Sequence, residues 1–197
     1  MFYTLRVTAI IVFAIIAGSA FVQTASGQAT DYLGLPAVNF GNAEFRLAWS
    51  SHPNSNYYKQ EYIAEGDNVE SFKSMILVEA VITENTPKEI MDAQIDKLKN
   101  LKSSNPYVNY DMFSKDGEYL LDFLLTDKAD SPGIVERNVY RYKQVKDSEG
   151  RDMVVLFGVS ERAYGPDIDS FIAGLKGNLS SLRDAVASYS IPELSLK

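Results

Sequence analysis

The sequence contains no cysteine and only one histidine among its 197 residues. Without cysteine, the chain cannot form disulfides, thiolate metal sites, a cysteine nucleophile or the lipid-attachment cysteine of a bacterial lipoprotein. A single histidine likewise excludes zinc sites that need two or three histidines. We therefore expect no metal and no cofactor, and a core that depends on apolar burial, which a chain of this length can supply.

The motifs of common enzyme classes are also missing. The sequence has no H-E-x-x-H, G-x-S-x-G, S-x-x-K, P-loop or G-x-G-x-x-G pattern. Residues 158–162 begin like a nucleophile elbow but lack its closing glycine, and we interpret them as part of a strand. Whether the protein is an enzyme stays open, although the sequence favours a protein that is not.

Residues 1–27 have the pattern of a signal peptide. Arg6 precedes an apolar run from Val7 to Val22, and Ala25 and Gly27 stand at the spacing that a signal peptidase recognises. The run is about sixteen residues long, shorter than the roughly 20 that cross a bilayer. We expect cleavage after Gly27, no stable membrane insertion afterwards, and export to a bacterial periplasm or the medium.

Acidic residues outnumber basic residues by 26 to 19, which gives a net charge of −7. Loss of Arg6 with the signal peptide would leave 18 basic residues against 26 acidic ones, a charge of −8. Such a chain is a poor partner for nucleic acid or an anionic lipid surface. Another envelope or secreted protein remains as a partner class, and the composition does not indicate the oligomeric state.

The hydrophobic pattern divides the rest of the chain into two parts. Residues 28–42 lack periodicity and predict an extended lead-in, whereas residues 43–197 predict a single α+β domain. Within the domain, Thr86, Pro87 and Glu89 form a capping box that starts a helix. The expected strands cover residues 45–50, 57–63, 76–82, 107–113, 118–126, 134–145 and 153–160, with a short helix at 68–75 and a closing helix at 167–189.

The order of these elements predicts an antiparallel sheet, because strands arrive in runs rather than alternating with helices. Residues 153–157 are apolar at every position, which is typical of a strand that is covered on both faces. We therefore expect an α/β/α sandwich with six to seven strands, two main helices and one short helix.

One stretch resembles a known class of proteins. The residues that carry the resemblance are Tyr58, Lys59, Gln60, Glu61, Tyr62, Ile63, Gly66, Glu70, Phe72 and Met75. They are similar to the strand, glycine turn and short helix of uncharacterised exported bacterial proteins, and the order of elements is similar to the PsbP-like fold. The resemblance implies that fold and an accessory or binding role, and it assigns no functional residue.

Three polar residues are candidates for catalysis. Glu79 and Asp122 stand in otherwise apolar predicted strands, where a carboxylate is costly unless it is paired. If they share a face with one of the arginines on neighbouring strands, they form either a buried ion-pair network or the polar floor of a cleft; they could also face solvent. His52 is either a lone general base or, more simply, a solvated turn residue.

Four large rings, Trp49, Tyr57, Tyr58 and Tyr62, concentrate around the first predicted hairpin. They either form a recognition surface for a protein or a sugar or pack in the core. Our leading hypothesis is an exported, non-enzymatic binding or accessory protein that uses this surface. The alternatives are a small hydrolase or lyase with carboxylates in a cleft, and a carrier of a small apolar ligand, which requires a sizeable cavity.

Overall fold

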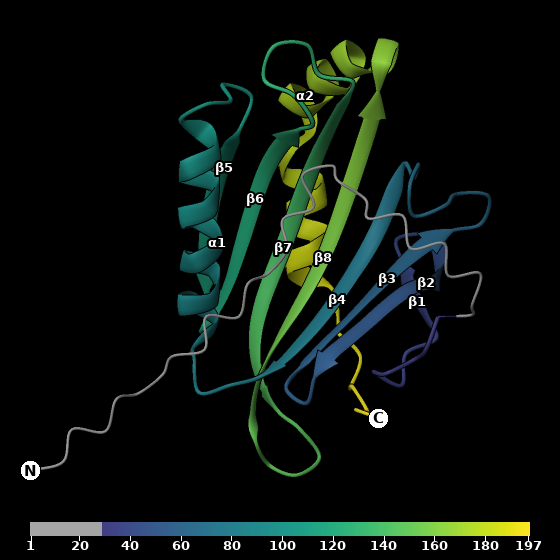
Figure 1. Cartoon of the computed structure of the whole chain (residues 1–197), viewed down its shortest axis with the longest axis vertical. Helices are drawn as coiled ribbons and strands as arrows, with labels where there is room; N and C mark the ends of the chain where they lie inside the picture. Colours follow the sequence, from purple (N-terminus) through teal and green to yellow (C-terminus); the bar gives the residue numbers. More distant parts are fainter. Residues whose placement is uncertain (1–28) are drawn as a thin grey trace, which may run out of the picture.

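The computed structural model describes residues 29–197 as one curved antiparallel sheet of eight strands with two helices (Figure 1). The strand order is β1-β2-β3-β4-β8-β7-β6-β5, so β1 and β5 form the edges. The strands are β1 (Ala37–Phe40), β2 (Ala43–Asn54), β3 (Tyr57–Ala64), β4 (Ser74–Ile82), β5 (Asn109–Lys115), β6 (Glu118–Thr126), β7 (Ile134–Lys146) and β8 (Asp152–Tyr164). The helices are α1 (Pro87–Lys102) and α2 (Ile168–Ser188), and a 3₁₀ turn at Gly165–Asp167 leads into α2.

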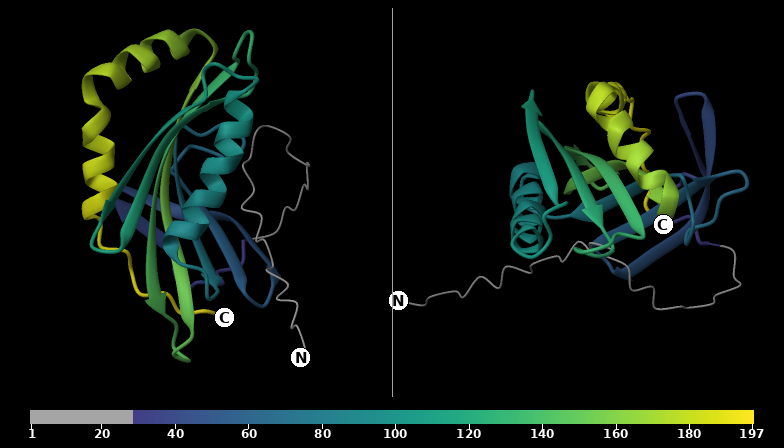
Figure 2. Two further views of the ribbon diagram at one scale, coloured as in Figure 1. Left: turned by 90° about the vertical axis from the view of Figure 1, so that its left-hand side faces the viewer. Right: turned by 90° about the horizontal axis from the view of Figure 1, so that it is seen from above.

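The expected fold of six to seven strands with two main helices and one short helix is wrong. Part of the segment expected as an extended lead-in forms β1, which adds a strand. After Asn68 there is only a turn, because its side chain accepts the backbone N–H groups of Glu70 and Ser71 while the chain already enters β4 at Ser74. The result is a single curled sheet rather than the PsbP-like sandwich (Figure 2).

Helix α1 begins where its capping box predicts. The Thr86 hydroxyl accepts the backbone N–H of Glu89 at 3.2 Å, and the Glu89 carboxylate accepts the backbone N–H of Thr86 at 2.7 Å. These reciprocal bonds satisfy two N–H groups that a helix start otherwise leaves unpaired. They fix the point at which the chain leaves β4 and crosses the sheet.

The two helices lie on opposite faces of the sheet, which we call the α1 face and the α2 face (Figure 2). Because side chains alternate along a strand, β8 contributes to both cores. Val154 and Leu156 pack with α1, whereas Val155 and Phe157 pack with the α2 side. All four are at most 3% exposed, so β8 is covered on both faces, as its apolar sequence predicts.

Helix α2 is held at its two ends and bends between them. Ile168 and Val186 are its buried residues, while the helix has a non-helical backbone at Asn178, with φ −141° and ψ 32°. Leu179, next to this bend, is 41% exposed. Neither helix in the described part of the chain has the length and apolar content that a membrane crossing requires.

Gly158 in the middle of β8 leaves space for a ring on the α1 face. Tyr140 of β7 lies opposite it, and a Cβ at position 158 would stand 2.6 Å from Cδ1 of that ring. Tyr140 in turn meets Phe123 edge-on, with centroids 5.0 Å apart. The glycine therefore allows the Tyr140 ring to lie flat over the central strand.

Gly158→Ala should lower the free energy of unfolding by about 1–3 kcal/mol, because the added methyl displaces a packed ring. The matched control is Gly174→Ala in α2, where a Cβ meets no atom within 4 Å. That change should be neutral or stabilise by up to ~1 kcal/mol, since alanine favours helix. Urea unfolding of both variants measures the difference, and equal effects at the two positions would refute the packing argument.

Candidate functional site

The two carboxylates that stand out in the sequence do not meet. Glu79 pairs across the ladder with Leu156, which faces α1, whereas Asp122 pairs with Val139, which belongs to the core on the α2 side. Strand alternation therefore places Glu79 on the α1 face and Asp122 on the α2 face. A cleft that contains both carboxylates does not exist in this arrangement.

Asp122 is part of a buried ion pair. Arg137 donates to both of its carboxylate oxygens, from Nε at 3.1 Å and from Nη2 at 2.8 Å. The same Nη2 also donates to the backbone carbonyl of Leu179 at 2.7 Å, and Arg183 Nε lies 3.6 Å from Asp122. Two elements of the sheet and the bend of α2 are thereby joined, so Asp122 has a structural role here.

Glu79 belongs to a cluster of buried charges on the α1 face. Lys59 Nζ lies 3.0 Å from Glu61 Oε1 and 3.9 Å from Glu79 Oε1, and all three residues are at most 6% exposed. The ammonium group also lies 5.7 Å from the centre of the Trp49 ring. Among the described residues, Glu61 Oε1 and Glu79 Oε2 have no partner with hydrogen-bond geometry. One lysine therefore compensates two carboxylates incompletely.

Burial raises the pKa of Glu79 to about 7, because the charged form loses its hydration. The nearby Lys59 ammonium and a hydrogen bond from Tyr57 oppose this shift, and Glu61 adds to it. Burial also raises the pKa of Tyr140 and Tyr142 well above its usual value, and the Glu79 charge adds to the effect on both. A pKa near 7 means that Glu79 changes its charge around neutral pH, beside the charged groups of Lys59 and Glu61.

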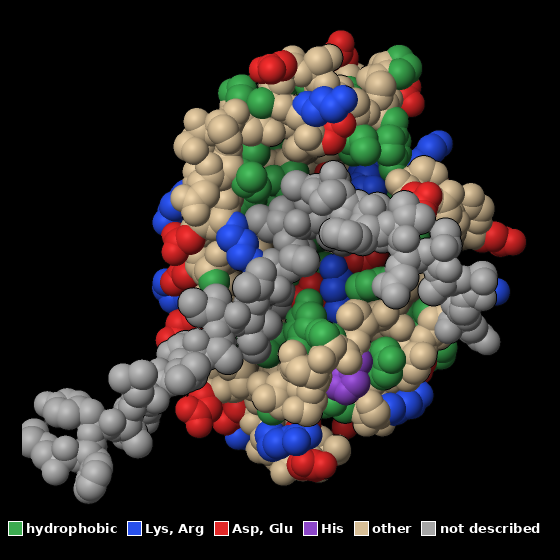
Figure 3. Space-filling view, viewed as in Figure 1, with side chains coloured by type: hydrophobic (Ala, Val, Ile, Leu, Met, Phe, Trp, Pro, Cys, Tyr) green, Lys and Arg blue, Asp and Glu red, His purple; other side chains and the backbone are tan. Residues whose placement is uncertain are grey.

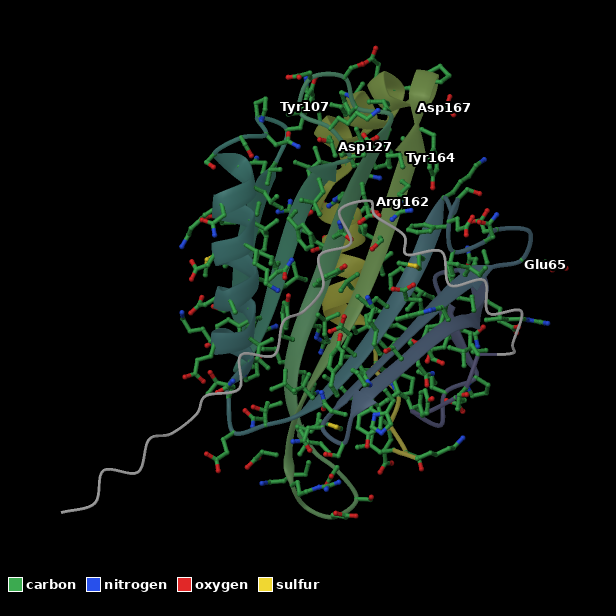
Figure 4. All side chains as sticks on the ribbon, viewed as in Figure 1. Glu65, Tyr107, Asp127, Arg162, Tyr164 and Asp167 are labelled. Atoms are coloured by element: carbon green, nitrogen blue, oxygen red, sulfur yellow. The ribbon has the colours of Figure 1, made fainter. Side chains whose placement is uncertain are left out.

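A cavity of about 40 Å³ lies beside this cluster, between β3, β4, β6, β7, β8 and α1. Its far wall is an ion pair between Glu136 and Arg162, and the Arg162 guanidinium stacks 4.0 Å above the Phe72 ring. Figure 3 shows charged and apolar side chains side by side on this face, and Figure 4 shows Arg162 and Tyr164 together on β8. The cavity has room for about one or two water molecules, which is too little for an organic substrate.

No group of three or more histidine, aspartate or glutamate side chains within residues 29–197 has the geometry to hold a metal ion. The Lys59 ammonium already occupies the position between Glu61 and Glu79. The α1-face cluster therefore resembles an internal ion-pair network more than a ligand site.

The four rings of the first hairpin do not form one surface. Trp49 is 41% exposed on the α1 face, and Tyr57 is buried on the same face. Tyr58 and Tyr62 are buried in the core on the α2 side, where the Tyr62 hydroxyl accepts a hydrogen bond from Gln60 at 2.6 Å. Only Trp49 of this set is available for recognition.

His52 packs at the edge of the core on the α2 side. Its ring stacks on Tyr58 with centroids 4.1 Å apart, and Tyr32 lies 5.2 Å away on a tilted plane. Nδ1 lies 3.0 Å from the backbone oxygen of Tyr57, which pins the ring across the hairpin. These contacts give His52 a structural explanation, and neither Glu79 nor Asp122 is among its partners.

A larger groove, not predicted from the sequence, lies on the α2 face between α2 and the β5–β6 hairpin. Its volume is about 530 Å³, and its walls are mainly apolar. Phe113 is 44% exposed there, with the Arg183 guanidinium 4.8 Å above its ring. The residues that line the groove are Phe113, Ser114, Lys115, Asp116, Glu118, Tyr119, Leu120, Arg141, Ser180, Arg183, Asp184 and Ala187.

The sequence contains only an indirect signal for this groove. Met112 and Phe113 are adjacent apolar residues in a strand, so alternation must expose one of them unless both faces are covered. Both are exposed, at 49% and 44%, because β5 is an edge strand. The depth of the groove depends on where α2 returns to the sheet, and local sequence patterns do not specify that position.

The pH dependence of stability tests the environment assigned to Glu79. Its pKa in the folded chain lies above the ordinary 4.5, so stability falls as pH rises from about 4.5 to about 7. Glu79→Gln removes this dependence and should raise the free energy of unfolding by roughly 3 kcal/mol at pH 8 but not at pH 4.5. Urea titrations across this range measure it, with Glu70→Gln, at an exposed position, as the control. Parallel profiles for the wild type and Glu79→Gln would contradict the prediction.

Comparisons with known proteins give one assignment. No curated protein matches the chain. The crystal structure of LpqN, involved in cell envelope biogenesis of Mycobacterium tuberculosis, is similar at 13% identity, over 73% of this chain and 82% of that one. The TM-score is 0.38, too low to support an argument about fold or function, and no comparison shows the PsbP-like resemblance. A protein-family model, by contrast, matches residues 33–191, and the chain belongs to that family.

Proposed function

We propose that the chain is an exported, non-enzymatic binding protein that holds a small amphipathic molecule in the groove between α2 and the β5–β6 hairpin. The observation that supports this proposal is the groove itself. Its volume of about 530 Å³ lies within the roughly 300–1,000 Å³ of typical small-molecule sites. The cavity beside Glu79, at about 40 Å³, lacks that capacity.

The lining of the groove defines the chemical class of the ligand. Phe113, Leu120 and Ala187 offer an apolar wall, and an aromatic or branched aliphatic body would cover the exposed Phe113 ring. The charged residues of the lining are Lys115, Arg141, Arg183, Asp116, Glu118 and Asp184, three of each sign. Because positive and negative side chains are equal in number, the lining does not favour a strongly charged ligand. A ligand with an apolar body and polar groups that face the charged residues fits best.

The groove replaces both surfaces suggested by the sequence. A hydrolase or lyase that uses Glu79 and Asp122 together has no geometric basis, because the two carboxylates occupy opposite faces of the sheet. Recognition through Trp49 and Tyr58 meets the same difficulty, since these rings also lie on opposite faces. The carrier of a small apolar ligand is the sequence hypothesis closest to this proposal.

Titration with the fluorescent probe 1-anilinonaphthalene-8-sulfonate tests the site, since the probe joins aromatic rings to a single anionic sulfonate, for which the lining offers Lys115, Arg141 and Arg183. Phe113→Ala should weaken binding about tenfold, which corresponds to 1.4 kcal/mol. Ala187→Trp should block the groove and abolish saturable binding.

The chain offers a matched control for this titration. Met112 is as exposed as Phe113 and adjacent to it, but strand alternation places it on the α1 face. Met112→Ala should leave the affinity unchanged. Equal losses at positions 112 and 113, or probe binding that survives Ala187→Trp, would refute the proposed site. Thermal unfolding of each variant confirms that the fold is retained.

A further inference from the structure

We propose that a second copy of this chain pairs with the free edge of β5 in an antiparallel, two-fold symmetric arrangement. The proposal does not depend on the ligand groove, although the two adjoin at Phe113 and Lys115, and it concerns the backbone edge of the sheet. Among the described residues, β5 pairs with β6 alone, so its other side carries unpaired backbone groups. Such an edge is a ready template for another strand.

β5 lacks several of the usual protections of an edge strand and carries only the charged side chains of Asp111 and Lys115. The strand has seven residues, no proline, and a regular register with β6 from Asn109 to Lys115. The opposite edge of the sheet, β1, has only four residues. Short strands, bulges and prolines normally discourage edge pairing, and only β1 uses one of these devices.

The backbone geometry shows which groups are free. The turn between β5 and β6 has positive φ at Asp116 (52°) and Gly117 (79°), as in a two-residue type I′ turn. In such a hairpin the flanking residues Lys115 and Glu118 exchange hydrogen bonds, and hydrogen-bonded positions then alternate along the strand. Tyr110, Met112 and Ser114 consequently direct their N–H and C=O groups away from β6.

One register of the second copy matches both the hydrogen bonds and the charges. With Phe113 opposite Phe113 of the other copy, Met112 faces Ser114 and Asp111 faces Lys115, and each pair occurs twice by symmetry. The Met112–Ser114 pairs exchange the free backbone hydrogen bonds. The Asp111–Lys115 pairs bring opposite charges together at positions where cross-strand side chains lie close.

The charges of β5 support this register. Neither Asp111 nor Lys115 has an ion-pair partner within the described chain. Asp111 lies opposite Asp122 of β6, whose charge is already compensated by Arg137. A lysine from a second copy would supply the counter-charge that Asp111 itself lacks. Pairing would also cover part of the exposed Met112 and Phe113, which are 49% and 44% accessible on the two faces of the strand.

The interface is small, because a seven-residue edge buries less than the roughly 1,200 Å² of standard stable interfaces. We therefore expect a weak, reversible dimer with a dissociation constant on the order of 10–100 μM. Sedimentation velocity of the full-length chain between about 5 and 500 μM covers this range.

Charge exchange distinguishes this interface from any other. Asp111→Lys alone and Lys115→Asp alone each place like charges opposite one another and should weaken the dimer by about tenfold or more. The double variant Asp111→Lys/Lys115→Asp restores opposite charges in the same register and should restore dimerisation. Glu70→Lys, an exposed charge change away from β5, should have no effect.

The free backbone groups have their own test. Ser114→Pro removes an N–H that points away from β6, so it should abolish the dimer and leave the β5–β6 ladder intact. Far-ultraviolet circular dichroism checks that the fold is retained. A wild-type chain that stays monomeric to 500 μM, or single variants that dimerise like wild type, would overturn the proposal. So would a double variant that fails to recover dimerisation when the wild type dimerises.

Discussion

Pairing of β8 along both of its sides is the constraint on which the other parts of the structure depend. The strand is hydrogen-bonded to β4 from Met153 to Glu161 and to β7 from Asp152 to Tyr164. Since every residue from Met153 to Ser160 is buried, a shift by one residue would exchange the two cores. The register of β8 therefore determines which residues of its neighbours face α1 and which face α2.

The sequence predicts local structure correctly where a few adjacent residues determine it. The capping box at Thr86 and Glu89 defines the start of α1, and the apolar run at residues 153–157 identifies a strand covered on both faces. By the same logic, Asn68 suggested a short helix. That interpretation failed because the chain must enter β4 within six residues, so its cap stabilises only a turn.

The sequence does not indicate which side chains of distant strands come into contact. Glu79 and Asp122 look alike in sequence, each a carboxylate in an apolar strand. Their separation depends on the registers of β4 with β8 and of β6 with β7, which are long-range pairings. For the same reason, the sequence did not indicate that Lys59 would be the partner of Glu79, or that the groove would form beside Phe113.

The two buried charge clusters differ in how well they are satisfied. Arg137 meets Asp122 through two hydrogen bonds and uses a third contact on the Leu179 carbonyl, so its charge is matched by acceptors. Lys59 instead lies between two carboxylates, and its charge does not offset the burial that raises the pKa of Glu79. A buried ion pair whose polar atoms all have partners holds its elements in a fixed geometry. A buried charge that is only partly compensated lowers the free energy of unfolding.

The attachment of α2 has a consequence for how the molecule moves. The helix is buried near Ile168 and Val186. Arg137 donates a hydrogen bond to its backbone carbonyl at Leu179, one residue beyond the bend at Asn178. Within the described residues, the helical segment between Ile172 and Asn178 has no comparable hydrogen bond to the sheet, and it is largely exposed. Its amide protons should therefore exchange with solvent before those of the C-terminal half. The helix would then fluctuate as two segments about Asn178. The C-terminal segment, which forms the wall of the groove, would open more slowly.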